Sequence, residues 1–155
     1  MPRSVSITEA RRTIGQLFSD VVVRRRPVLI ERHGHAGLLV GEDDAVDLLA
    51  PYEFHTEALF EAGAVSLWVP ELALYGRGSS YDEATADLVD EVRAYIDEYW
   101  VEIERYRHAP NRAGHFPYLC RAYLADRRGR LLDVLLAEPS GSLHRHASEG
   151  PVAPG

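Results

Sequence analysis

Apolar positions near the start of the chain follow the period of a helix. They recur at short helical spacings and form one stripe, made by Ala10, Ile14, Leu17, Phe18, Val21 and Val22. Ser6 or Thr8 can accept hydrogen bonds from the first free backbone N–H groups, and Pro27 cannot continue a helix. We therefore predict a helix that starts after Ser6 or Thr8 and stops before Pro27, preceded by a short strand at 4–7.

Two short apolar runs, at 28–30 and 38–40, flank the segment Glu-Arg-His-Gly-His-Ala-Gly. Gly34 and Gly37 allow the chain to reverse tightly, so this pattern predicts a β-hairpin. A short helix is predicted at 43–50, where Pro51 ends it. The first part of the chain is thus expected to contain a strand, a helix, a hairpin and a short helix, in that order.

A second pattern of elements begins near Pro51. Strands are predicted at 54–60, 64–69 and 72–75, with a loop at 76–79. Ser80 and Glu83 have the spacing of a capping box, in which each side chain satisfies a free N–H group at the start of a helix. Apolar residues recur at helical spacing after them, so a long helix is expected to run to about Arg107.

The rest of the chain is predicted to be a linker, a helix and one further element before a polar tail. The linker is 109–114, and Pro117 suits the first turn of a helix that runs to about Arg127. The apolar run at 131–137 fits either a strand or a helix. We therefore predict four parts: a module at 1–50, a β-β-β-α module at 51–107, an extension at 108–138 and a disordered tail at 139–155.

Composition allows a packed core, and charge separates the chain into regions. The 155 residues suffice for one domain or two small ones, and 46% of them are hydrophobic. All 17 basic residues are arginine. Residues 1–40 hold seven arginines against three acids, whereas 41–104 hold 17 acids against two arginines. A protein with a net charge of −7 can still bind a polyanion if one module gathers the positive charge.

Three segments in the first part match one known family in order and spacing. They are Ser-Ile-Thr-Glu-Ala-Arg at 6–11, Pro-Val-Leu-Ile-Glu-Arg-His-Gly at 27–34 and Ala-Gly-Leu-Leu-Val at 36–40. Residues 3–50 thereby resemble the Phd/YefM antitoxins. The resemblance implies a small α/β fold that dimerises through its sheet and binds a palindromic operator to repress its own operon. It also implies an antitoxin of a type II toxin–antitoxin system, which neutralises a cognate toxin.

The same resemblance assigns two arginines to DNA contact. Arg11, on the polar side of the first helix, and Arg32, beside the hairpin turn, match family positions that bind DNA. A guanidinium group suits phosphate oxygens or guanine edges. Neighbouring candidates are Arg3, Arg12 and His33. The alternative is structural, with Arg11 paired to Glu9 or Asp20 and Arg32 paired to Glu31.

A second resemblance covers 52–104. The Val-Pro-Glu-Leu segment at 69–72 and the Gly-Ser-Ser-Tyr-Asp-Glu-Ala segment at 78–84 are similar to HicB-like antitoxins. The chain departs from that pattern at 74–75, where Leu-Tyr replaces the usual Gly-Cys pair, and a generic capped strand-turn-helix is the alternative. The resemblance implies a module that binds a toxin, and an acidic surface would speed the capture of a basic one. We expect the toxin-binding residues within 51–138 and a RelE-, Doc- or HicA-like toxin as partner.

The sequence has no motif for catalysis, a cofactor or a metal. Phosphate-binding glycine loops and a Gly-x-Ser-x-Gly elbow are absent. Cys120 lies on the apolar side of a predicted helix, which favours a packing role over a nucleophile. The His-x-His pairs at 33–35 and 144–146 lack a further ligand at metal-like spacing. We therefore expect a protein that is not an enzyme and that holds neither cofactor nor metal.

Two alternatives to a DNA-binding antitoxin stay open. One is a toxin-binding or scaffold protein without DNA binding, and the other is a nuclease of the ribonuclease-H type, whose chemistry needs several carboxylates around Mg²⁺. The sequence has no apolar run long enough for a bilayer, no secretory signal and only one cysteine, so we expect a cytoplasmic protein without membrane contact. The expected fold class is α/β, and the expected assembly is a homodimer.

Overall fold

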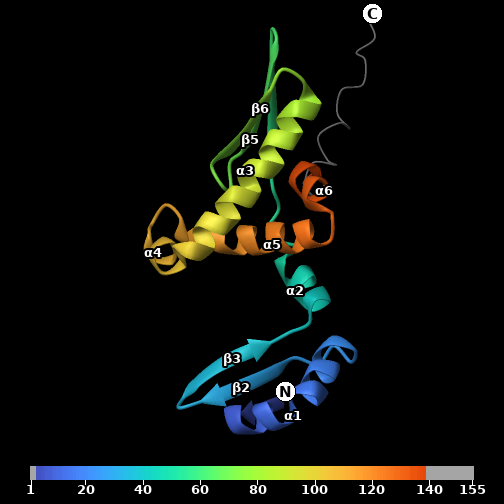
Figure 1. The fold of residues 1–155 in the computed structure, drawn as a ribbon, viewed down its shortest axis with the longest axis vertical. Coiled ribbons are helices and arrows are strands. Elements are labelled where there is room, and N and C mark those ends of the chain that lie inside the picture. Colours follow the sequence, from blue (N-terminus) through green and yellow to red (C-terminus); the bar gives the residue numbers. More distant parts are fainter. Residues whose placement is uncertain (1–2, 139–155) are drawn as a thin grey trace, which may run out of the picture. The chain divides into compact units, whose positions relative to one another are not determined.

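The computed structural model describes residues 3–138, which form two compact units that divide between Pro51 and Tyr52 (Figure 1). The first unit contains β1 (Arg3–Ser6), α1 (Ile7–Val22), β2 (Val28–Arg32), β3 (His35–Leu39) and α2 (Glu42–Leu49). The second contains β4 (Glu57–Glu61), β5 (Ala64–Val69), β6 (Leu74–Gly78), α3 (Tyr81–Val101), α4 (Ile103–His108), the 3-10 helix η1 (Ala113–His115), α5 (Phe116–Arg127) and α6 (Leu131–Leu136). The predicted disordered tail at 139–155, with its histidine pair, lies outside the described residues.

The first unit is a three-stranded sheet, ordered β1-β2-β3, with α1 packed on one face. β1 pairs in parallel with β2, and β2 pairs antiparallel with β3. A small core joins the sheet to the helix and consists of Val5, Ala10, Leu17, Val21 and Val28. The predicted order of strand, helix, hairpin and short helix is confirmed.

Helix α1 begins at the first of its two candidate caps. The Ser6 hydroxyl accepts a hydrogen bond from the N–H group of Glu9 at 3.2 Å. The helix ends at Val22, earlier than the stop that Pro27 predicts. Arg25 adopts a left-handed conformation with φ 52°, which a continuing helix does not allow, so the chain turns before the proline is reached.

The second unit is built on an antiparallel sheet, ordered β4-β5-β6, with α3 against one face. The predicted first strand is shorter than expected, because it begins at Glu57 while Phe54 is buried in the core before it. Buried residues of the sheet, α3, α5 and α6 form the main core, including Leu67, Val69, Leu88, Val92, Tyr99, Leu119 and Leu135. No helix within 3–138 is long and apolar enough to cross a membrane.

The prediction of a loop at 76–79 is wrong, because 76–78 completes β6. A Cβ atom on Gly76 would lie 2.5 Å from the carbonyl oxygen of Ala84 and 2.5 Å from the Cβ of Leu88. A Cβ atom on Gly78 would lie 2.5 Å from that of Glu83. These glycines let a strand approach a helix closely, and they do not reverse the chain.

Helix α3 starts at the predicted capping box, except that the Glu83 carboxylate binds the N–H group of Ser79 and not that of Ser80. The Ser80 hydroxyl accepts a hydrogen bond from the N–H group of Glu83 at 3.2 Å. The Glu83 carboxylate accepts from the Ser79 N–H group at 2.8 Å, and hydrogen bonds from Ser79 lower the pKa of that carboxyl. Glu102 leaves helical geometry with φ −103° and ψ 26°, so the single helix predicted to about Arg107 is two helices, α3 and α4.

The last helices agree with the sequence-based expectation. Pro117 lies in the first turn of α5, which ends at Arg127 as predicted. The apolar run at 131–137, for which a strand and a helix were both possible, forms α6. The predicted linker at 109–114 overlaps η1. Cys120 in α5 is only partly buried, and burial raises the pKa of its thiol, which disfavours the nucleophilic thiolate.

Candidate functional site

Arg11 and Arg32 belong to elements that meet at one end of the first unit. Ser6 at the end of β1 is opposite Glu31 in the parallel register, and α1 begins immediately after Ser6. Alternate side chains of a strand share a face, so Arg32 is on the same face of β2 as Val28, which packs against α1. Figure 1 shows the first turns of α1, in dark blue, on the side of the turn between β2 and β3.

Three of the four candidate arginines have no neutralising partner among the described residues. The side chains of Arg11, Arg12 and Arg32 are exposed and form no hydrogen bond or ion pair with another residue of the described range 3–138. The carboxylates that were the alternative partners of Arg11 are engaged by other arginines: Glu9 at 3.3 Å and Asp20 at 2.7 Å. The charges at 11, 12 and 32 therefore stay available to an anionic partner.

The other two candidates differ from one another. Arg3 lies 3.3 Å from Glu9 and 3.6 Å from Asp20, so its charge is already compensated. His33 occupies the turn between β2 and β3 with φ 50°, and Gly34 follows with φ 79°. Two successive positive φ values are those of a type I′ turn, which suits the twist of a hairpin. His33 is therefore exposed at the hairpin tip.

The arginines at 24–26 lie near the opposite end of the sheet, before β2 begins. Arg24 pairs with an acid of α1 at 2.7 Å. Arg25 donates hydrogen bonds to Asp44 and Asp47, each at 2.8 Å, which tie the end of α1 to α2 and raise the pKa of Arg25. Arg26 is exposed, and its guanidinium has no partner in the part of the chain that the structure describes.

Half of the predicted apolar stripe of α1 points away from the core. Ile14, Phe18 and Val22 are 56%, 62% and 44% exposed, and their spacing of four residues places them along one side of the helix. Thr13 departs from helical geometry just before them, with φ −119° and ψ 22°. Helix α1 thus has one apolar side in the core and a second that is uncovered.

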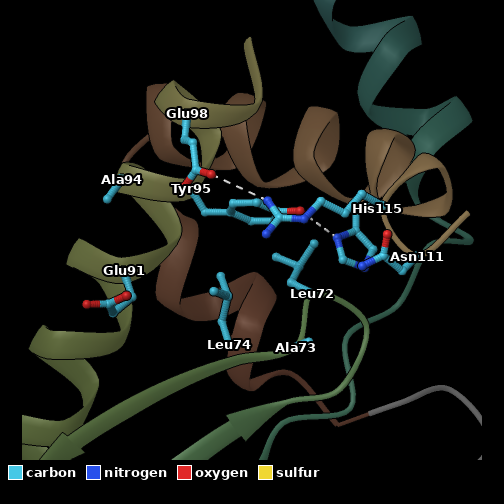
Figure 2. Close-up of a pocket in the computed structure, with 10 residues that line it drawn as sticks. Leu72, Ala73, Leu74, Glu91, Ala94, Tyr95, Glu98, Asn111 and His115 are labelled. Carbon is cyan, nitrogen blue, oxygen red and sulfur yellow. Dashed lines mark hydrogen bonds and ion pairs between the residues drawn. The ribbon is translucent and has the colours of Figure 1, made fainter. Parts of the chain in front are cut away.

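The second unit holds a pocket of about 380 Å³ (Figure 2). Its lining comes from the turn before β6, from α3 and from the segment around η1: Leu72, Ala73, Leu74, Glu91, Ala94, Tyr95, Glu98, Asn111, Arg112 and His115. The Tyr95 hydroxyl is 2.7 Å from Nδ1 of His115, and Arg112 donates to Glu98 at 3.4 Å. The Arg112 guanidinium also stacks on Tyr106, 4.3 Å from the ring centroid. Most polar side chains of the pocket thus form hydrogen bonds or ion pairs with one another.

Burial and charge set the protonation of this pocket. Burial, followed by the charge of Arg112, lowers the pKa of His115, and burial raises the pKa of Tyr95. The imidazole is therefore neutral and the phenol protonated at neutral pH. The lining residues come from segments far apart in the sequence and match no motif, so no spacing signal predicts the pocket. Within 3–138, no three His, Cys, Asp or Glu side chains come together to hold a metal ion.

A solved structure has the same fold. It is described as an antitoxin part of a toxin/antitoxin system from Syntrophomonas wolfei subsp. wolfei, and the TM-score is 0.75 over 85% of this chain and 95% of that chain. The sequences are 24% identical, so this likeness carries the fold alone. The class of fold is therefore mixed α/β.

The sequence itself places the chain in a family. A family model named PHD_like, described as an antitoxin of toxin-antitoxin, RelE / RelB, TA system, matches residues 1–137. The chain belongs to this antitoxin family, whose members are regulatory proteins and not enzymes. Membership implies a cognate toxin as partner. Among curated proteins, no match to the chain is found.

Proposed function

We propose that this antitoxin binds operator DNA as a homodimer through its first unit, represses its own operon, and neutralises its toxin through its second unit. Residues 1–50 form the Phd/YefM-like module for dimerisation and DNA. The toxin-binding residues lie within 51–138, in an acidic module that resembles HicB. Of the RelE-, Doc- and HicA-like toxins, the family description supports a RelE-like partner.

The arginines without partners carry the DNA-binding half of the proposal. Arg11 and Arg32 are exposed and unpaired within 3–138, whereas Arg3 and Arg25 are held in ion pairs. Arg11 lies near the start of α1, and Arg32 lies at the end of the strand that pairs with β1, where the positive end of the helix dipole would add to their charge. A phosphate group at this end would meet a fork of donors and a favourable field. Arg12 and His33 extend the same surface.

The uncovered side of α1 supports the homodimer. Ile14, Phe18 and Val22 form an apolar row that a single copy leaves in water. Monomeric proteins seldom expose contiguous apolar side chains of this size without a partner. A second copy that covers the row would repeat the Arg11 and Arg32 surface at a fixed spacing, as a palindromic operator requires.

The separation of charge along the chain supports two different partners for residues 1–40 and for the acidic segment that follows them. Residues 1–40 hold seven arginines against three acids, and 41–104 hold 17 acids against two arginines. DNA is attracted to the first region and repelled by the second, while a basic toxin behaves in the opposite way. Because the four acids of α2 balance the arginines of the first unit as a whole, the attraction for DNA comes from residues 1–40 alone.

The DNA-binding proposal is tested with the full chain and a labelled fragment of its own promoter. Arg11→Ala and Arg32→Ala should each weaken binding by about 1–3 kcal/mol. The slope of log affinity against log salt should fall by roughly 0.9 for each phosphate that the variant no longer neutralises. Arg26→Ala is the matched control, because it removes the same charge near the other end of the sheet and breaks no ion pair among the described residues.

Two results would overturn parts of this proposal. If the double variant Arg11→Ala/Arg32→Ala binds the promoter as tightly as Arg26→Ala, the assigned DNA surface is wrong. If the unaltered chain binds its toxin but not its promoter at low salt, the protein is a toxin-binding protein without DNA contact. Circular dichroism of each variant shows whether the fold is retained.

A further inference from the structure

We propose that the toxin docks in a groove between α3 and α5, inserting an apolar side chain beside Trp100 and pairing an arginine or lysine with Asp97. This inference rests on the proposed toxin binding by the second unit and names where the contact is made. The groove has a volume of about 370 Å³ and is lined by Ile96, Asp97, Trp100, Val101 and Tyr123.

The groove exposes large apolar side chains to solvent. Trp100 is 41% exposed, Val101 82% and Tyr123 46%, while Ile96 forms a buried floor. Burial of such groups on association is favourable, at about 25 cal/mol per Å² of apolar surface. Aromatic residues in a shaped hollow are the usual centres of binding energy at protein interfaces.

Trp100 is already held in one orientation. Its ring stacks on Phe116 at 6.1 Å with an interplanar angle of 25°, and the Arg107 guanidinium lies 4.0 Å from the centroid of the Phe116 ring. The centroid of the Tyr123 ring lies 6.3 Å from that of Trp100, with an interplanar angle of 30°. A partner therefore meets a preorganised surface, and little entropy is lost in ordering it.

The charge at the groove selects a basic partner. Asp97 is the charged residue among those that line it, and its carboxylate is exposed and forms no ion pair within the described range. Arg93, one turn earlier on α3, forms an ion pair with Asp126 at 2.8 Å, so it does not neutralise Asp97. An arginine or lysine of the partner would supply the missing positive charge.

The same charge argues against a second copy of this chain as the occupant. Packing of α3 against its own symmetry mate would bring Asp97 toward the Asp97 of the other copy. Like charges that face one another across an interface are unfavourable. A basic toxin gains attraction where a second copy meets repulsion.

The experiment uses the full-length antitoxin and the purified product of the small open reading frame beside its gene. Val101→Asp and Asp97→Arg should each weaken the complex by about tenfold or more in titration calorimetry. Leu59→Asp and Glu61→Arg are the matched controls, since they make the same chemical changes at exposed positions of β4, and they should bind like the unaltered chain.

A spectroscopic readout locates the contact. Trp68 and Trp100 are the two tryptophans of the chain, so Trp68→Phe leaves Trp100 as the reporter. Toxin addition should shift the Trp100 emission to shorter wavelength as its indole leaves water. An unshifted spectrum in a saturated complex would overturn the inference.

The remaining outcomes separate this inference from the proposed function. If the unaltered antitoxin does not bind that gene product, toxin neutralisation through the second unit fails and this inference fails with it. If it binds, and Val101→Asp and Asp97→Arg bind as tightly as their controls, only the groove assignment is wrong. If Val101→Asp instead lowers the sedimenting mass of the antitoxin alone, the groove joins two copies and the toxin assignment is overturned.

Discussion

Gly76 is a position where one added methyl group tests how closely β6 packs on α3. It is buried, and its backbone is outside the left-handed range, so alanine meets no conflict of φ there. The new Cβ atom would lie 2.5 Å from the carbonyl oxygen of Ala84, 2.5 Å from the Cβ of Leu88 and 2.7 Å from the Leu88 nitrogen. Gly76→Ala therefore changes the packing distance and leaves the chain conformation otherwise allowed.

The expected destabilisation follows from these distances. Optimal separations between non-bonded heavy atoms are about 3.5–4.0 Å, so the strand and the helix must part by roughly 1 Å. Two of the three neighbouring atoms belong to the backbone of α3, which no change of rotamer can move. Overpacking of this kind costs about 1–3 kcal/mol, while alanine gains about 0.4–1 kcal/mol by restricting the unfolded chain. We expect the free energy of unfolding to fall by about 1–2 kcal/mol in total.

Urea unfolding followed by tryptophan emission measures this decrease. Trp68 and Trp100 both belong to the second unit, so the signal reports the unit that contains Gly76. Gly114→Ala is the control, because no atom lies within 4 Å of its added Cβ and its φ is ordinary. If Gly76→Ala is as stable as Gly114→Ala, the close approach of β6 to α3 does not require glycine at position 76.

Two further substitutions test the second unit. Ser80→Ala removes the hydroxyl that caps α3 and should lower the free energy of unfolding by about 1 kcal/mol, whereas Ser80→Asp should retain most of it. Because the folded pKa of His115 lies below its ordinary 6.5, the unfolded state takes up that proton first, and stability should fall as the pH drops below 6.5. His115→Gln should flatten this pH dependence in the same urea assay, and an unchanged slope would assign it to other groups.

Local signals along the chain were enough to place most helices and their starts. The Ser6 cap, the Ser80 cap, Pro117 in a first turn and the two-residue hairpin turn each act through neighbours within a few positions. A cap or a turn depends on hydrogen bonds and φ values of adjacent residues, which the residue types already favour. The order of elements in the first unit was therefore predictable without coordinates.

Long-range packing explains where sequence reasoning went wrong. The segment at 76–79 looks like a loop because glycines most often mark turns, but Gly76 and Gly78 are needed where α3 crosses β6. The apolar stripe of α1 predicts a single buried side, yet Ile14, Phe18 and Val22 are exposed. Whether a glycine or an apolar residue meets another element depends on segments that come together only on folding.

The candidate site likewise has one feature that the sequence predicted and one that only the fold decided. The residue types at 11 and 32 were readable as anion ligands, because a guanidinium group is suited to phosphate wherever it lies. Which arginines remain unpaired depended on the fold: Arg3 reaches Glu9 and Asp20, and Arg25 reaches α2, while Arg11 does not find a carboxylate in the described chain. Ion pairs, pockets and grooves form between segments that are distant in the sequence. The residues that meet there are set by three-dimensional proximity, so no periodicity or spacing in the sequence predicts them.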